Sequence, residues 1–159
     1  MVKKAFSVAI RRMNISNDNI SSEQIGDINN LLQQLLPEDA PREELTSMHL
    51  INFSLVSDHV IIIAQDLATK KIVGMATLHL KPLLARGLIG EVEEFVVDEA
   101  YRGQGIAGRI HDEIVVAAKK EGVHELRLTS APWRVIANEF YRRRGYVPYD
   151  TNVYRRALP

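Results

Sequence analysis

The stretch "EAYRGQGIAGRIHDE", residues 99–113, decides the fold. Its three glycines follow the pattern G-x-G-x-x-G at positions 103, 105 and 108, and apolar residues at helical spacing begin directly after them. A glycine turn that leads into a helix presents unpaired backbone N–H groups, and the helix dipole is positive at the same end. Residues 103–108 therefore predict a binding site for a phosphate group.

The glycine pattern of this loop is that of a dinucleotide-binding loop, but the strands before and after it do not fit such a site. A nicotinamide site needs an acidic residue where the strand after the helix ends, and that strand ends in Thr129 and Ser130. Glu125 lies at its other end. The strand before the loop, "EVEEFVV" at 91–97, carries three glutamates, which suit the middle of a doubly wound sheet poorly. The sequence therefore argues against a nicotinamide cofactor.

The apolar pattern along the chain predicts one domain, residues 1–159, without a linker or an internal repeat. Ser21 and Gln24 carry the signature of a capping box at the start of a helix that Pro37 ends, and Pro41 opens the next helix. The predicted strands are 6–13, 59–66, 71–80, 91–97, 124–130, 146–149 and 152–157, the predicted helices are 21–36, 41–53, 105–122 and 132–145, and residues 82–90 are a predicted loop.

Composition and charge exclude several classes of function. The chain has 20 basic and 20 acidic side chains, so we expect no nucleic-acid partner, which usually requires a basic excess. There is no cysteine, and the five histidines show no metal-ligand spacing, so we expect no metal site. No stretch has the pattern of a signal peptide or of a membrane span. We expect a soluble, cytoplasmic protein without membrane contact.

Three motifs together resemble a known family. They are "RGQGIA" at 102–107, which matches [Q/R]-x-x-G-x-[G/A], the acidic strand "GEVEEFVV" at 90–97, and "ANEFYRRRGY" at 137–146. In this order and spacing they resemble the GNAT superfamily of acyl-coenzyme A dependent N-acetyltransferases. The resemblance covers nearly the whole chain. It implies a mixed α/β fold with a twisted, mixed and mostly antiparallel sheet of six to seven strands flanked by helices, in the order β-α-α-β-β-β-α-β-α-β-β.

The resemblance also implies a site for acetyl-coenzyme A as co-substrate, without a metal. Main-chain N–H groups from Gly103 to Gly108 would hold its pyrophosphate, and its pantetheine arm would pair with the end of the acidic strand. A backbone N–H near Val97 would stabilise the oxyanion of the reaction. The implied contact residues are Phe95, Val96, Val97, Arg102, Gly103, Gln104, Gly105, Ile106, Ala107, Gly108, Asn138 and Tyr141.

The same resemblance assigns the proton transfers. An ammonium group must lose a proton before it can attack the thioester, and the acidic strand is similar to the acceptor region of glucosamine phosphate acetyltransferases. We expect Glu93 to be the base, with Glu94 and Glu91 as alternatives. Tyr141 occupies the tyrosine position of the family and would protonate the leaving thiolate as a general acid.

Several alternatives stay open at this level. The chain could be a coenzyme A binding module without turnover, or could transfer a longer acyl group. The acceptor could be a small molecule or a protein amine, and the glutamates favour a cationic acceptor over an acidic one. A homodimer is compatible with the sequence.

Overall fold

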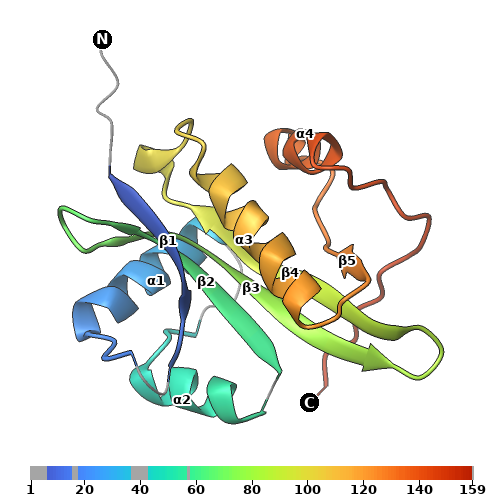
Figure 1. Cartoon of the computed structure of the whole chain (residues 1–159), viewed down its shortest axis with the longest axis horizontal. Coiled ribbons are helices and arrows are strands. Elements are labelled where there is room, and N and C mark those ends of the chain that lie inside the picture. The colour runs from blue at the N-terminus through green and yellow to red at the C-terminus, as the bar shows by residue number, and fades with distance from the viewer. Residues whose placement is uncertain (1–6, 16–17, 37–42, 57, 159) are drawn as a thin grey trace. The chain divides into compact units, whose positions relative to one another are not determined.

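Figure 1 shows the computed structural model, which describes residues 7–15, 18–36, 43–56 and 58–158. The element boundaries predicted at Phe6, Pro37 and Pro41 lie outside these residues. The chain divides into two compact units, Met1–Leu128 and Thr129–Pro159. In the part of the chain that is described, no helix combines the length and the apolar character needed to cross a bilayer.

The first unit is built on one five-stranded sheet. Its strands lie in chain order, and neighbours run antiparallel except for the last pair, which is parallel. The strands are β1 (Val8–Met13), β2 (His59–Asp66), β3 (Ile72–Leu83), β4 (Gly87–Val97) and β5 (Glu125–Arg127). The mixed, mostly antiparallel sheet is therefore confirmed, although it has fewer strands than the expected six to seven.

Helices cover both faces of this sheet (Figure 1). They are α1 (Ser22–Leu35), α2 (Ser47–Val56) and α3 (Ile106–Lys120). On one face, Ile110 and Ile114 of α3 are fully buried against the strands. On the other face, Ile28 and Leu31 of α1 are buried with them. The central strands are apolar on both sides because helices lie on both sides, which explains the β-branched run that predicted β2.

Strand β4 contains a β-bulge. Met75 of β3 pairs with Val96 and Thr77 pairs with Glu93, so three steps along β4 match two steps along β3. Glu94, inside the bulge, has a φ of 45°, a left-handed conformation that residues with a Cβ rarely adopt. The extra residue reverses the alternation of side chains along the strand.

The reversal is visible in the two cores. Before the bulge, Val92 packs on the α3 face, so Glu91 and Glu93 point to the α1–α2 face. After the bulge, Val96 packs on the α1–α2 face and Val97 on the α3 face. A regular strand would have placed Val92 and Val96 on the same face.

Two predicted boundaries in the first unit are wrong. Helix α2 begins at Ser47, and residues 43–46 before it are not helical. The predicted loop 82–90 is instead a hairpin, since β3 continues to Leu83 and β4 starts at Gly87. Gly87 has a φ of 71° and serves the turn itself, so it marks a change of direction and not the end of strand structure.

The second unit contains helix α4 (Val135–Arg143) and, among its described residues, no strand. The predicted strands 146–149 and 152–157 are therefore wrong, and the predicted strand 124–130 shortens to β5. Val153 is 77% exposed. The apolar residues of this segment favour a strand, but strand preference has little effect without a neighbouring strand and a surface to cover.

The capping box of α1 yields a stability prediction. Ser21 Oγ accepts from Gln24 N–H at 3.2 Å, and Gln24 Oε1 accepts from Ser21 N–H at 3.2 Å. We expect Ser21→Ala to lower the free energy of unfolding by about 1 kcal/mol, because an N–H of the first turn loses its acceptor. Urea denaturation followed by circular dichroism measures the change. Ser21→Asp keeps an acceptor and should stay close to the wild type; equal losses in both variants would contradict the role of the cap.

Candidate functional site

The glycine loop and the first turn of α3 expose backbone donors. Gly103 and Gly105 both have a φ of 76°, which glycine adopts without strain. Gly105 is the N-cap of α3, and a Cβ added to it would meet no atom within 4 Å. The first backbone hydrogen bond of α3 runs from Arg109 N–H to Gly105 O at 3.2 Å. The N–H groups of residues 106–108 therefore have no acceptor within the helix, and this end of α3 suits an anion.

A buried hydrogen bond fixes the start of the loop. Tyr101 donates its hydroxyl to Asp66 Oδ2 at 3.0 Å, and both side chains are buried. Asp66 Oδ1 accepts from Ala68 N–H at 2.8 Å and from Thr69 N–H at 3.3 Å. Burial, together with the Asp66 carboxylate, raises the pKa of Tyr101, so the phenol keeps the proton that it donates. The loop is thereby tied to the turn between β2 and β3.

An ion pair makes a second connection to that turn. Lys71 Nζ lies 2.8 Å from Asp98 Oδ2, and Asp98 Oδ1 accepts from Ala100 N–H at 3.0 Å. Burial opposes the ionisation of Asp98, but the Lys71 ammonium and the Ala100 N–H outweigh it, so the pKa of Asp98 lies below its usual value. The hydrogen bond to Asp98 also raises the pKa of Lys71. Arg102 connects the loop to β4 instead, because its Nε donates to Val97 O at 2.9 Å.

Strand β4 runs on beyond the point where β5 ends. β5 pairs with it over Ile89–Glu91, and no other strand of the described chain continues this pairing. Asp98 N–H donates to Val73 O of β3 at 2.9 Å. Since successive N–H groups of a strand point to opposite sides, Val97 N–H points away from β3. The end of β4 therefore presents backbone groups on the side where β5 has stopped.

The three glutamates of β4 have different surroundings. Glu91 pairs with Lys81, whose Nζ lies 3.0 Å from Glu91 Oε1. Glu94 occupies the bulge. Glu93 reaches solvent, and no hydrogen bond or ion pair joins its side chain to another residue that the structure describes.

The pKa of Glu93 is raised above its usual value. Partial burial of its carboxylate is the main cause, and the charges of Glu94 and Glu91 act in the same direction. His79 on β3 acts in the opposite direction. Glu93 is thus better suited to take up a proton than an ordinary surface glutamate.

In the second unit, Asn138 and Tyr141 lie one turn apart on α4. Asn138 Nδ2 donates to Ala131 O at 2.9 Å, which gives it a local role before the helix. The ring of Tyr141 meets the ring of Tyr146 edge-on, with centroids 5.7 Å apart. Burial, followed by the charge of Tyr141, raises the pKa of Tyr146 to about 12. The roles expected of Asn138 and Tyr141 toward a co-substrate stay predictions.

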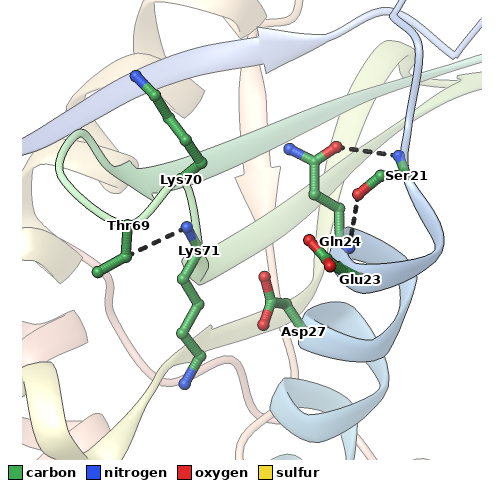
Figure 2. A pocket seen from close by; sticks show the side chains of 7 residues that line it. All are labelled: Ser21, Glu23, Gln24, Asp27, Thr69, Lys70 and Lys71. Atoms are coloured by element: carbon green, nitrogen blue, oxygen red, sulfur yellow. Dashed lines mark hydrogen bonds between the residues drawn. The ribbon is translucent and has the colours of Figure 1, made fainter.

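A cavity of about 320 Å³ lies between the start of α1 and the β2–β3 turn (Figure 2). Its lining residues are Ser21, Glu23, Gln24, Asp27, Thr69, Lys70 and Lys71. Several are already engaged in structural contacts, since the capping box occupies Ser21 and Gln24, and Asp27 Oδ2 accepts from Ile72 N–H at 3.0 Å. None of the predicted site residues lines it. The cavity therefore lies beside Lys71, whose ion pair with Asp98 supports the loop, and away from the predicted site.

The structure brings the acidic strand, the backbone of Phe95–Val97 and the glycine loop together in the first unit. Ile106 is buried, so it offers a ligand only its backbone. Asp66, Lys71 and Asp98 are not predicted from the sequence, because each is a charged residue where an apolar strand meets a turn, a common position for solvated charges. Within the described residues, no group of three or more acidic or histidine side chains could hold a metal ion.

The chain is similar in sequence to known proteins. Residues 25–146 match the family described as "Acetyltransferase (GNAT) family". A curated relative, glucosamine 6-phosphate N-acetyltransferase 1 of Oryza sativa subsp. japonica, is 30% identical over 120 residues, which are 74% of this chain and 71% of the relative. The family match includes the acidic strand, the glycine loop and α4.

Solved structures share the fold. Glucosamine-6-phosphate N-acetyltransferase from Arabidopsis thaliana has a TM-score of 0.73 at 22% identity, covering 94% of this chain and 98% of that chain. A protein from Clostridium acetobutylicum described as a predicted acetyltransferase, solved with acetyl-CoA, has a TM-score of 0.71 at 17% identity, covering 94% of this chain and 96% of that chain. At these identities the likeness establishes the fold alone.

The ion pair beneath the loop yields a second prediction. Lys71→Met should lower the free energy of unfolding by about 1–2 kcal/mol near neutral pH, because Asp98 loses its cation while its side chain stays 8% exposed. This loss of stability is smaller than that expected for a fully buried ion pair, because the Lys71 side chain is 38% exposed. Chemical denaturation over a range of pH measures it.

The pH dependence follows from the direction of the pKa shift. Because Asp98 has a lowered pKa when folded, the pair stabilises the protein above the unfolded pKa of about 4, and this stability is lost as the pH falls through the folded value. The difference between variant and wild type should therefore shrink in acid. Lys70→Met, at the exposed neighbouring lysine, is the matched control and should show no such change. An equal loss in both lysine variants would contradict the assignment.

Proposed function

The chain belongs to the acetyltransferase (GNAT) family of acyl-coenzyme A dependent enzymes, and we propose that it transfers an acetyl group from acetyl-coenzyme A to a primary amine by direct attack. One observation carries the proposal. In the first unit a glycine-lined helix start adjoins a strand end without a β5 partner, and that strand bears a glutamate of raised pKa. An anion site, a backbone edge and a base are what this reaction requires.

The glycine loop holds the pyrophosphate of the co-substrate in this proposal. A phosphate can approach the backbone closely because Gly103 and Gly105 carry no side chain, and the positive end of α3 faces it. Arg102, Gln104 and Ala107 complete the loop. Its connections to the β2–β3 turn keep the N–H groups in place before the ligand arrives, which lowers the entropic cost of binding.

The pantetheine arm continues along the end of β4 as an added strand, bonded to the backbone of Phe95–Val97. Two observations support this placement: β5 stops pairing at Glu91, and Val97 N–H points away from β3. The same N–H then lies beside the thioester carbonyl. It stabilises the negative charge that develops on the oxygen when the amine attacks.

Glu93 is the base. It accepts a proton from the acceptor ammonium, directly or through water, and the free amine forms a bond to the thioester carbon. The nitrogen of the tetrahedral intermediate gives up its second proton to water, and the C–S bond breaks to release a thiolate. Tyr141 donates its hydroxyl proton to that thiolate and regains a proton from solvent.

We place both compact units in one acetyltransferase domain, because the family match continues across their boundary. The roles of Asn138 and Tyr141 in this proposal rest on the resemblance of residues 137–146 to the family's motif. The acceptor is a primary amine of a small molecule or a protein, and glucosamine 6-phosphate is a candidate because a relative is named for acting on it. The proposal also includes a cytoplasmic location and the ability to form a homodimer. It includes no nucleic-acid or membrane partner.

A thiol-release assay tests the reaction. The purified protein should release free coenzyme A from acetyl-coenzyme A only when an amine is present. Tyr141→Phe should lower kcat about 100-fold and leave the KM for acetyl-coenzyme A nearly unchanged, because it removes a proton donor and keeps the ring. Calorimetric binding without turnover of any amine would instead identify a coenzyme A binding module. Faster turnover with a longer acyl thioester would identify a different donor.

The pH profile tests the choice of base. The kcat/KM for an amine should fall in acid as Glu93 becomes protonated, with an apparent pKa above that of an ordinary glutamate. Glu93→Gln should lower kcat/KM at least about 100-fold. Glu94→Gln should move the acid limb to lower pH, because the charge of Glu94 raises the pKa of Glu93.

Glu91→Gln is the matched control for Glu93→Gln, since Glu91 is paired with Lys81 and lies on the same face of β4. It should retain most of the activity, with at most a smaller shift of the acid limb to lower pH. If Glu91→Gln loses as much activity as Glu93→Gln, or if the limb does not move in Glu94→Gln, Glu93 is not the base.

A further inference from the structure

Three aromatic side chains from different elements meet on the α1–α2 face of the sheet. The ring centroid of Phe53 on α2 lies 4.0 Å from that of His59 on β2 and 5.6 Å from that of His79 on β3. The two histidines are directly paired across the strands, with centroids 6.3 Å apart. All three side chains are half-buried. This aromatic patch (Phe53, His59 and His79) therefore packs as a unit and still presents ring surface to solvent.

The patch adjoins the proposed base. His79 pairs with Glu91 across β3 and β4, and Thr77, two residues away, pairs with Glu93. Diagonal neighbours across an antiparallel pair lie about 7–8 Å apart, so His79 and Glu93 share one face within side-chain reach. The charge of His79 also acts on the pKa of Glu93.

Two acidic residues of β4 lie on the face of the patch: Glu91 directly opposite His79, and Glu93 diagonal to it. Glu91 is paired with Lys81, which lies farther along β3 on the same face. Thr77 is 2% exposed and carries no charge. An ammonium group beside His79 would therefore have the Glu93 carboxylate about 7–8 Å away, at the diagonal position.

We propose that the aromatic patch binds the carbon skeleton of the acceptor and selects primary amines that carry a sugar or aryl ring close to the amino group. Aromatic rings pack against other aromatic rings and against the C–H face of a sugar, and they attract organic cations, while the Glu93 carboxylate attracts the ammonium. An amino-sugar ring and an arylalkyl group share this chemistry, whereas a short acyclic amine reaches Glu93 without covering the rings. The inference rests on the acetyl transfer proposed above and specifies its acceptor.

Phe53→Leu tests the patch, because it keeps an apolar side chain on α2 and removes the ring. Steady-state thiol release is measured with glucosamine 6-phosphate, 2-phenylethylamine and ethylamine, above the pH at which Glu93 titrates. The kcat/KM of the ring amine that the wild type prefers should fall about fivefold, through KM, as expected for the loss of one aromatic contact. The kcat/KM of ethylamine and the KM of acetyl-coenzyme A should not change. A loss confined to the sugar or to the aryl amine identifies which ring the site takes.

Further variants separate recognition from folding. Phe53→Tyr keeps the ring and should restore the preference. Leu55→Ala, at a 76% exposed position of the same helix, should leave all three amines unaffected. His79→Gln removes a second ring and should give the same selective loss, which keeps the test valid if Phe53→Leu does not fold in a thermal unfolding experiment.

Two results would overturn the inference: an equal loss for ring and acyclic amines in Phe53→Leu, or a wild type that prefers ethylamine. If the wild type releases no thiol with any amine, it is the acetyl transfer that fails. The two failures are therefore distinct.

Discussion

Strand β4 takes three steps, from Glu93 to Val96, where β3 takes two, and this extra residue sets which faces Glu93 and Val97 occupy relative to each other. Before the bulge, Glu93 points to the α1–α2 face; after it, Val97 packs toward α3 while its N–H points away from β3. A bulge also bends its strand and increases the local twist, which accords with the end of pairing to β5 at Glu91. The left-handed conformation of Glu94 is energetically unfavourable. It persists because β4 pairs regularly with β3 on both sides of the bulge.

The glycine loop depends on a different kind of interaction. Its backbone has little side-chain packing of its own, so its position comes from polar contacts of Tyr101, Asp98 and Arg102 with residues outside the loop. Two of these contacts are to the β2–β3 turn, where Asp66 is almost fully buried. Buried hydrogen bonds and ion pairs are expensive to leave half-made, so the loop and the turn keep a single relative arrangement. Donors held in advance bind an anion with less loss of entropy.

The features that the sequence predicted well are those governed by neighbouring residues. The capping box at Ser21, the run of β-branched residues in β2 and the glycine entry into α3 each follow from local geometry and periodicity. The predictions for the start of α2 and for residues 82–90 are wrong because proline and glycine do not always end an element: here Pro82 lies within β3 and Gly87 makes the turn into β4.

Other features depend on contacts between distant parts of the chain. The bulge was invisible in the sequence, because Glu94 is not a residue that favours a left-handed conformation. The partners of Asp66 and Asp98 are 35 and 27 residues away along the chain, beyond the range of any periodic pattern. The distinction among Glu91, Glu93 and Glu94 likewise required Lys81, which is brought beside Glu91 only by the hairpin.

The parallel pairing of β4 and β5 has a consequence for how such a protein can change. The chain has to cross back over the sheet between these strands, and it does so through the glycine loop and α3. The glycine loop therefore follows the unpaired end of β4 directly in the chain, so the backbone itself keeps the two close together. Helix α2 enters from a separate stretch of chain. In the proposed reaction, sequence changes in α2 could therefore alter the acceptor while the loop and the strand edge that bind the donor stay the same.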